Sequence, residues 1–170
     1  IFPQEKPLEA PVSVDVVGME TPMVALGWRL PAKADPQYGI MSVVQQILTN
    51  GKCGLFDENL NNAQQVMQAM TFLDGMTDQS AFWAIGCPKE GQSLEEVRDL
   101  MLSQVRLLAG GEWDESLLKG ILNNMKRRQL EDMQSNEMRA HRFVDAFVSG
   151  QEWADAVGEM QRLDTLTKKT

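Results

Sequence analysis

Apolar and polar residues alternate near the start of the chain in the pattern of β-strands. Val12, Val14 and Val16 are separated by polar residues, which predicts a half-buried strand. The segment from Gly18 to Pro22 supplies turn-forming residues, and the apolar run from Met23 to Leu30 predicts a second strand. The beginning of the chain therefore predicts two consecutive strands.

A hairpin is predicted in the middle of the chain. Two β-favouring runs, Val66 to Leu73 and Ser80 to Cys87, flank the turn-forming sequence Asp74 to Asp78. A loop of about five residues between such runs is typical of an antiparallel hairpin. Pro88 and Gly91 follow, and we expect them to end this part of the sheet.

Apolar residues at helical spacing predict the first helix. Asp35 suits the N-cap and Pro36 suits the first helical position, while Asn50-Gly51 stops the apolar stripe. The stripe consists of Ile40, Val43, Val44, Ile47 and Leu48. These signals predict a helix that starts at Pro36 and ends before Asn50.

The second half of the chain is predicted to be mainly helical. Ser93 and Glu96 form a capping box, because the serine accepts a hydrogen bond from the amide three residues on while the glutamate reaches back. Gly110-Gly111 closes that helix, another starts at Asp114, and a further one ends before Gly150. Their apolar stripes are Val97, Leu100, Met101, Val105 and Leu108; Leu117, Leu118, Ile121, Leu122 and Met125; and Ala140, Phe143, Val144, Phe147 and Val148.

This order of elements predicts an α+β fold with two layers, an antiparallel sheet with helices packed on one face. The chain has 170 residues, of which 43% are apolar, and this is enough material for the core of one domain. We therefore expect residues 1–170 to form a single α+β domain. The chain begins Ile-Phe-Pro-Gln-Glu, with no initiator methionine and no signal-peptide pattern, so we expect it to be excised from a longer chain.

The charge and the apolar runs argue against two classes of partner. The formal net charge is −8, whereas nucleic-acid and anionic-membrane surfaces depend on clustered lysines and arginines. The longest apolar runs are far shorter than the roughly 20 residues that cross a bilayer. Cys53 and Cys87 lie in no C-x-x-C pair, so neither a disulfide scaffold nor a thiolate zinc site is expected. We thus expect no nucleic-acid partner and no membrane span.

His141 is the only histidine, and this bears on zinc hydrolase chemistry. The motifs H-E-x-x-H and H-x-x-E-H each require two histidines, so neither is present. Glu137 and His141 are four residues apart and share a face of the predicted helix, but no third ligand is evident. A surface pair is the ordinary explanation, and we expect no metal site in this domain. The glycines match no phosphate-binding motif, so no cofactor site is expected.

Cys53 is the best candidate for a nucleophile in the chain. It lies in the glycine-flanked loop Gly51 to Gly54, where the neighbouring Lys52 would favour a thiolate. His141 would have to act as its base, and no G-x-S-x-G elbow offers a serine instead. A small residue in a tight turn is the alternative that we favour. We therefore expect no catalytic residue in this domain.

Two further features have an ordinary structural explanation. Glu131 and Asp132 follow the basic cluster Lys126-Arg127-Arg128, which indicates a solvated helix face rather than an anion site. The chain has 11 methionines, which suit either an adaptable binding surface or a core. Many of them lie within the predicted stripes, so we expect them in the core.

Four segments of the chain carry a family resemblance. They are Ala25 to Pro31, Ile47 to Phe56, Gly91 to Val97, and Gly111 to Leu118. The first is similar to the second strand of the repeated domain of the insulinase/pitrilysin metallopeptidases, and the next to a helix end that leads through a glycine turn to a short helix. The resemblance covers nearly the whole chain.

The resemblance implies a domain without catalytic residues. Members of this family enclose a peptide-binding chamber between homologous domains, of which only one binds zinc, through the H-x-x-E-H motif that is missing here. A second domain type supplies an arginine and a tyrosine from a pattern like L-R-x-x-x-x-L-G-Y. Aligning that pattern on Leu60 places Asn61 at the arginine, Val66-Met67 at the Leu-Gly and Gln68 at the tyrosine, and the only tyrosine, Tyr38, lies far upstream. The chain is most similar to the zinc-less domain that follows the catalytic one.

The function implied by the resemblance is that of a non-catalytic structural domain that lines the substrate chamber of a zinc-dependent metallopeptidase. Zinc is expected in the catalytic domain of the parent chain, and that domain and peptide substrates are the implied partners. The ending Leu163 to Thr170 is similar to a point before a final helix and strand, which we expect to be missing. For a bacterial protein, the compartment would be the periplasm or the cytoplasm.

Two alternatives stay open. A proteolytically silent homologue of the same fold would capture peptides or a partner protein, for example by adding a strand to an exposed sheet edge. A small thiol enzyme that uses Cys53 is the weaker alternative. An H-x-x-E-H motif in a preceding segment of the parent chain would favour the peptidase domain, and its absence would favour the binding module.

Overall fold

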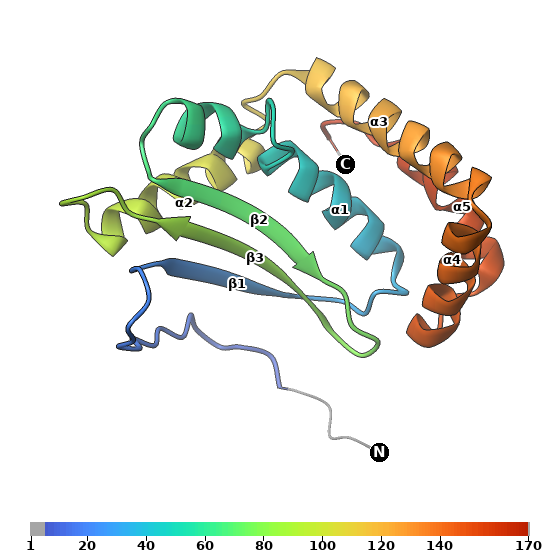
Figure 1. Ribbon diagram of the computed structural model, residues 1–170, viewed down its shortest axis with the longest axis horizontal. Helices are drawn as coiled ribbons and strands as arrows, with labels where there is room; N and C mark the ends of the chain where they lie inside the picture. The colour runs from blue at the N-terminus through green and yellow to red at the C-terminus, as the bar shows by residue number, and fades with distance from the viewer. Residues whose placement is uncertain (1–5, 170) are drawn as a thin grey trace.

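Residues 6–169 are described by the computed structural model, and they form a three-stranded sheet with helices on one side (Figure 1). The elements in chain order are β1 (Val24–Leu30), α1 (Pro36–Leu48), the π-helix η1 (Asp57–Asn62), β2 (Gln68–Asp74), β3 (Ser80–Cys87), α2 (Leu94–Ala109), α3 (Glu115–Gln134), α4 (Asn136–Ser149) and α5 (Trp153–Leu163). Helix α1 packs on β2 and α2 packs on β1 and β3, whereas α3, α4 and α5 lie beyond α1. The expected α+β architecture is confirmed. None of these helices is long and apolar enough to span a bilayer.

The sheet has the strand order β1-β3-β2, and β3 runs antiparallel to both neighbours. The predicted hairpin is confirmed as β2 and β3, although β2 begins at Gln68 instead of Val66. The strand predicted from Met23 to Leu30 is confirmed as β1. The register places Trp83 of β3 opposite both Gly27 of β1 and Phe72 of β2, so these three residues share one face of the sheet.

The strand predicted over Val12 to Val16 is not formed, and this prediction is wrong. Residues 11–18 belong to no strand, and Val12, Val14 and Val16 are each at least 75% exposed. Alternating residues form a strand only where they make backbone hydrogen bonds with a partner strand, and the three-stranded sheet β1-β3-β2 includes no strand from this segment. Near β1 the N-terminal segment is held by a side chain, since Arg29 Nη1 donates to the carbonyl oxygen of Lys6 at 2.9 Å. The first five residues, from which we expected a chain excised from a longer one, lie outside the described residues.

The predicted helix starts are confirmed by their caps. The Asp35 side chain accepts a hydrogen bond from the backbone N–H of Gln37, with Pro36 in the first turn of α1. Ser93 and Glu96 form the predicted capping box of α2, with distances of 3.1 Å and 3.0 Å for its two hydrogen bonds. Asp114 caps α3 through the backbone N–H of Ser116. Short polar side chains therefore fix where these helices begin, because they satisfy amides that have no partner inside the helix.

The core lies between the sheet and the helices α1 and α2. Its largest fully buried side chains are those of Leu48, Phe56, Leu60, Val97 and Met101. They come from α1, from α2 and from the segment that contains η1. Elements far apart in the sequence therefore pack on the same face of the sheet. These buried residues belong to one hydrophobic cluster.

Helix α4 is confirmed, but its apolar stripe does not pack into this core. Phe143, Val144, Phe147 and Val148 are all more than half exposed. The helix packs through its small residues instead, because Ala146 and Ser149 are the buried ones. Helix α5, which the periodicity did not predict separately, follows after a left-handed residue at Gly150.

Candidate functional site

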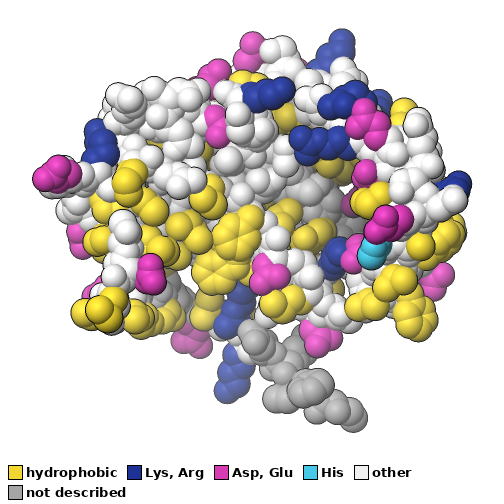
Figure 2. All heavy atoms as spheres, in the orientation of Figure 1, with side chains coloured by type: hydrophobic (Ala, Val, Ile, Leu, Met, Phe, Trp, Pro, Cys, Tyr) yellow, Lys and Arg dark blue, Asp and Glu magenta, His cyan; other side chains and the backbone are white. Residues whose placement is uncertain are grey.

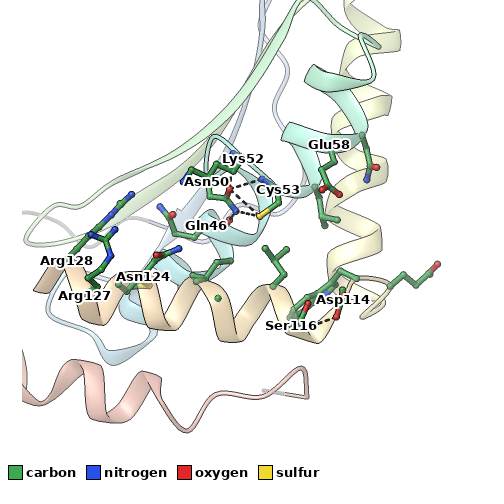
Figure 3. A pocket seen from close by; sticks show the side chains of 18 residues that line it. Gln46, Asn50, Lys52, Cys53, Glu58, Asp114, Ser116, Asn124, Arg127 and Arg128 are labelled. Atoms are coloured by element: carbon green, nitrogen blue, oxygen red, sulfur yellow. Dashed lines mark hydrogen bonds between the residues drawn. The ribbon is translucent and has the colours of Figure 1, made fainter.

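The first candidate site is a cavity of about 590 Å³ between α3 and the loop after α1 (Figure 3). Its lining combines polar side chains from both elements. Asn50, Lys52 and Cys53 come from the loop, and Ser116, Asn124 and Arg127 come from α3. Cys53, the candidate nucleophile, thus lies at a cavity, where catalysis would also require a base nearby.

The loop that carries Cys53 is held by a buried carboxylate. Asp57 is only 6% exposed, and its Oδ2 accepts hydrogen bonds from the backbone N–H groups of Asn50, Gly51 and Gly54 at 2.8, 2.9 and 3.1 Å. Gly54 is required there, because an added Cβ would lie 2.5 Å from the carbonyl oxygen of Leu48. The glycine-flanked loop is therefore a rigid turn built around Asp57.

Cys53 itself is exposed, and its thiol lies beside the side chain of Asn50. The Asn50 Oδ1 accepts hydrogen bonds from the backbone N–H groups of Lys52 and Cys53, both at 3.0 Å, and the Cys53 thiol lies 3.8 Å from the same oxygen. His141 lines a different hollow, formed by α3 and α4. The structure therefore does not bring the thiol and the imidazole to one site, although nucleophilic catalysis by Cys53 would need both.

The pair formed by Glu137 and His141 lies on the surface of α4. Their nearest side-chain atoms, Oε1 and Nε2, are 3.9 Å apart, and the side chains are 82% and 72% exposed. In the described part of the chain, no group of three or more His, Cys, Asp and Glu side chains is arranged to hold a metal ion. The geometry is that of a solvated pair within one helix.

Of the residues aligned with the arginine and tyrosine of the family pattern, Asn61 lies in η1 and Gln68 is the first residue of β2. Asn61 Nδ2 donates to the carbonyl oxygen of Ala69 at 2.8 Å, and the Ala69 N–H donates to Asn61 Oδ1 at 2.7 Å. Asn61 thus anchors the backbone of β2, which is a structural task. Tyr38 lies elsewhere, against Gly75 at the β2–β3 turn, where burial and then the carboxylate of Asp145 raise the pKa of its hydroxyl.

Two side chains of the basic cluster of α3 are paired with acidic side chains. Lys126 Nζ lies 2.5 Å from Asp164 Oδ2, and Arg127 Nη1 lies 2.7 Å from Glu131 Oε1. At the far end of the first cavity, Asp114 has a lowered pKa, chiefly because its carboxylate accepts a hydrogen bond from the backbone of Ser116. Charges of both signs therefore line this cavity. The ion pairs of Lys126 and Arg127 agree with the predicted solvated helix face.

The second candidate site is the face of the sheet that carries no helix. Met70 and Phe72 of β2 are 38% and 40% exposed, and Phe72 stacks on Trp83 with ring centroids 6.4 Å apart. Ile85 continues the same face of β3, and Figure 2 shows apolar side chains gathered over the sheet on this side of the molecule. We call this surface, formed by Met70, Phe72, Trp83 and Ile85, the open sheet face.

Sequence reasoning missed the open sheet face, although a signal for it was present. Residues of β3 are apolar on both faces, whereas a sheet with one solvated face alternates apolar and polar residues. The methionines gave a second signal. The expectation that they lie in the core is wrong for six of the 11: Met19, Met23, Met67, Met70, Met76 and Met138 are exposed.

Solved structures with this fold come from bacterial proteases. A protease from Helicobacter pylori superposes with a TM-score of 0.80 at 21% identity, over 86% of this chain and 36% of that chain. An inactive peptidase domain from Bordetella parapertussis gives 0.75 at 14% identity, over 86% of this chain and 80% of that chain. The periplasmic protease PqqL from Escherichia coli gives 0.67 at 17% identity, over 86% of this chain and 16% of that chain. At these identities the likeness shows the fold.

The chain spans 36% of the Helicobacter pylori protease chain, so it matches one part of a longer protein there. No curated protein sequence matches the chain significantly. A family profile does match it, over residues 1–125, and this family is described as the Peptidase M16 inactive domain. Because the match covers well over half of the sequence, the chain belongs to the inactive-domain family of the M16 metallopeptidases.

Proposed function

We propose that this chain is a non-catalytic domain of a longer zinc-dependent metallopeptidase, in which it forms part of the wall of the chamber that holds peptide substrates. Zinc is bound by a catalytic domain of the same longer protein, and this domain packs against it. Membership of the inactive-domain family supports the non-catalytic role. We also propose that residues 1–170 belong to a single α+β domain of that protein.

The chamber role is supported by the arrangement of the sheet, because helices cover only one of its two faces. Helices α1 and α2 pack on one face only, and the other face presents the apolar side chains of the open sheet face (Figures 1 and 2). A surface of this kind in a protease domain suits contact with the side chains of an unfolded substrate. The domain would then contribute binding area while another domain supplies the chemistry.

One observation favours the alternative of a proteolytically silent binding module. The outer edge of β1 pairs with no described strand, so its backbone N–H and C=O groups can accept an added strand from a peptide or partner protein. This alternative shares the fold and the peptide ligand with the first proposal. It differs in that the longer protein would contain no zinc and cleave nothing.

Zinc content and peptide cleavage separate the two functions. We expect the 170-residue chain to bind no stoichiometric zinc and to cleave no unstructured fluorogenic peptide, because the described residues offer no cluster of three ligands. The longer protein should hold one zinc ion in its catalytic domain and cleave the peptide. Elemental analysis and a fluorescence assay on both proteins measure this.

His141→Ala in the 170-residue chain is the matched control for zinc. It should leave the zinc content at background, as in the unchanged chain, because His141 lies in an exposed pair with Glu137. A stoichiometric zinc ion in the chain that disappears in this variant would refute the non-catalytic assignment. Absence of zinc and activity in the longer protein as well would favour the binding module.

A further inference from the structure

The open sheet face is flat and aromatic at its centre. An added Cβ at Gly27 would lie 2.8 Å from Cζ3 of Trp83, so the indole lies across β1 and covers the glycine. On its other side the indole stacks on Phe72 at an interplanar angle of 21°. The two rings and Gly27 therefore form a continuous apolar floor over all three strands, which a side chain larger than glycine at position 27 would break.

Methionines occur on this floor and just beyond both ends of β2. Met70 is part of it, and Met67 and Met76, at the two ends of β2, are 57% and 55% exposed. Met side chains are unbranched and polarizable, so they adapt to ligand side chains of different shape and make favourable contacts with aromatic rings. The surface suits a class of apolar ligands rather than one fixed shape.

The size of the open sheet face decides between a folded partner and a short peptide. The whole sheet, three strands about 4.8 Å apart and each of seven or eight residues, covers on the order of 300 Å², and the open sheet face is part of this area. A stable complex with a folded protein, or with a second copy of this chain, buries about 800 Å² on each side. The open sheet face is too small for that but wide enough for a few residues of an extended peptide.

We propose that the open sheet face binds short extended peptide segments through apolar side chains, with Phe72 and Trp83 as the floor and Met70 as an adaptable contact. This inference rests on the proposed function and gives it a substrate class, peptides with closely spaced methionine, leucine or aromatic residues. The exposed stripe of α4, which appears in Figure 2 at the right, is not part of the site.

Fluorescence anisotropy with labelled nonapeptides tests this on the full 170-residue chain. One peptide carries Met, Leu and Phe at alternating positions between serines, and the other carries asparagine at those three positions. We expect saturable binding of the first peptide only. The double variant Met70→Thr/Phe72→Thr keeps β-forming residues and should weaken that binding by about tenfold or more, since buried aromatic anchors dominate such contacts.

Two control variants make the result specific. Phe72→Leu keeps the apolar surface and should bind within about threefold of the unchanged chain. Phe147→Ser alters the exposed stripe of α4, where the side chain is 86% exposed, and should not change binding. Far-UV circular dichroism and thermal midpoints establish that all variants are folded.

Several outcomes would overturn the inference. They are equal binding of the two peptides, no saturation with the apolar peptide, undiminished binding by the folded Met70→Thr/Phe72→Thr variant, and loss of binding in Phe147→Ser alone. The outcome of the peptide-binding test is independent of the outcome of the zinc test of the proposed function. Zinc bound by this chain would refute the proposed function whatever the peptides do, whereas absence of peptide binding leaves the zinc result untouched.

Discussion

Phe56→Ala should lower the free energy of unfolding by about 3–5 kcal/mol, as expected for truncating a fully buried aromatic side chain. Phe56 has no exposed surface and lies at the start of the segment that leads into η1, inside the core between the sheet and the helices. The truncation removes apolar contacts and leaves a cavity that the neighbouring elements cannot fill. Urea denaturation followed by circular dichroism measures the change.

Phe147→Ala is the matched control, because it makes the same chemical change on α4, where the side chain is 86% exposed. It should alter the free energy of unfolding by less than about 0.5 kcal/mol. A loss in Phe147→Ala comparable to that in Phe56→Ala would contradict the described packing, because it would mean that the stripe of α4 is buried within this chain.

Asp57→Ala should destabilise the chain by about 3 kcal/mol. The carboxylate is buried and accepts three backbone hydrogen bonds, from Asn50, Gly51 and Gly54, and alanine would leave these N–H groups without their acceptor. The loop from Asn50 to Gly54 would also lose its shape, so alkylation of Cys53 should become faster. Urea denaturation and thiol labelling report the two effects.

Asp57→Asn and Glu58→Ala are the controls for this variant. The asparagine oxygen can still accept hydrogen bonds from the loop, so Asp57→Asn should retain part of the stability. Glu58 is the exposed neighbour on the same helical turn, and its removal should cost less than about 0.5 kcal/mol. A stability for Asp57→Ala equal to that of Glu58→Ala would show that the carboxylate does not hold the loop.

The parts of the fold that were predictable are those with local causes. The caps at Asp35, Ser93 and Asp114 act on amides only two or three residues away, so their signal is complete within a short stretch of sequence. The hairpin of β2 and β3 was predictable for the same reason, because its two strands are joined by a short turn.

The failures concern partners that are far away in the sequence. Val12, Val14 and Val16 have the alternation of a strand, but a strand also needs an edge to pair with, and periodicity does not report that edge. The stripe of α4 is as apolar as that of α1, and nothing in its spacing indicates that the small residue Ala146 faces inward instead. The local sequence pattern thus predicted where the helices and strands lie better than it predicted which of their residues are buried.

The candidate site was harder to predict than the fold. The role of Asp57 depends on a loop that folds back onto it, and a lone aspartate in a polar stretch gives no sign of this. The open sheet face depends on which face of the sheet the helices cover. Its clearest signal in the sequence, apolar residues on both faces of β3, is recognisable only once the strand pairing is known.

Photo-crosslinking of a bound substrate tests the chamber role most directly. A peptide with a benzophenone side chain at an apolar position would be bound to the longer protein after a chelator has removed zinc, so that it is held without cleavage. Our account predicts crosslinks to Met70, Phe72 or Trp83 on the open sheet face. Crosslinks confined to other domains, with none in residues 6–169, would contradict it.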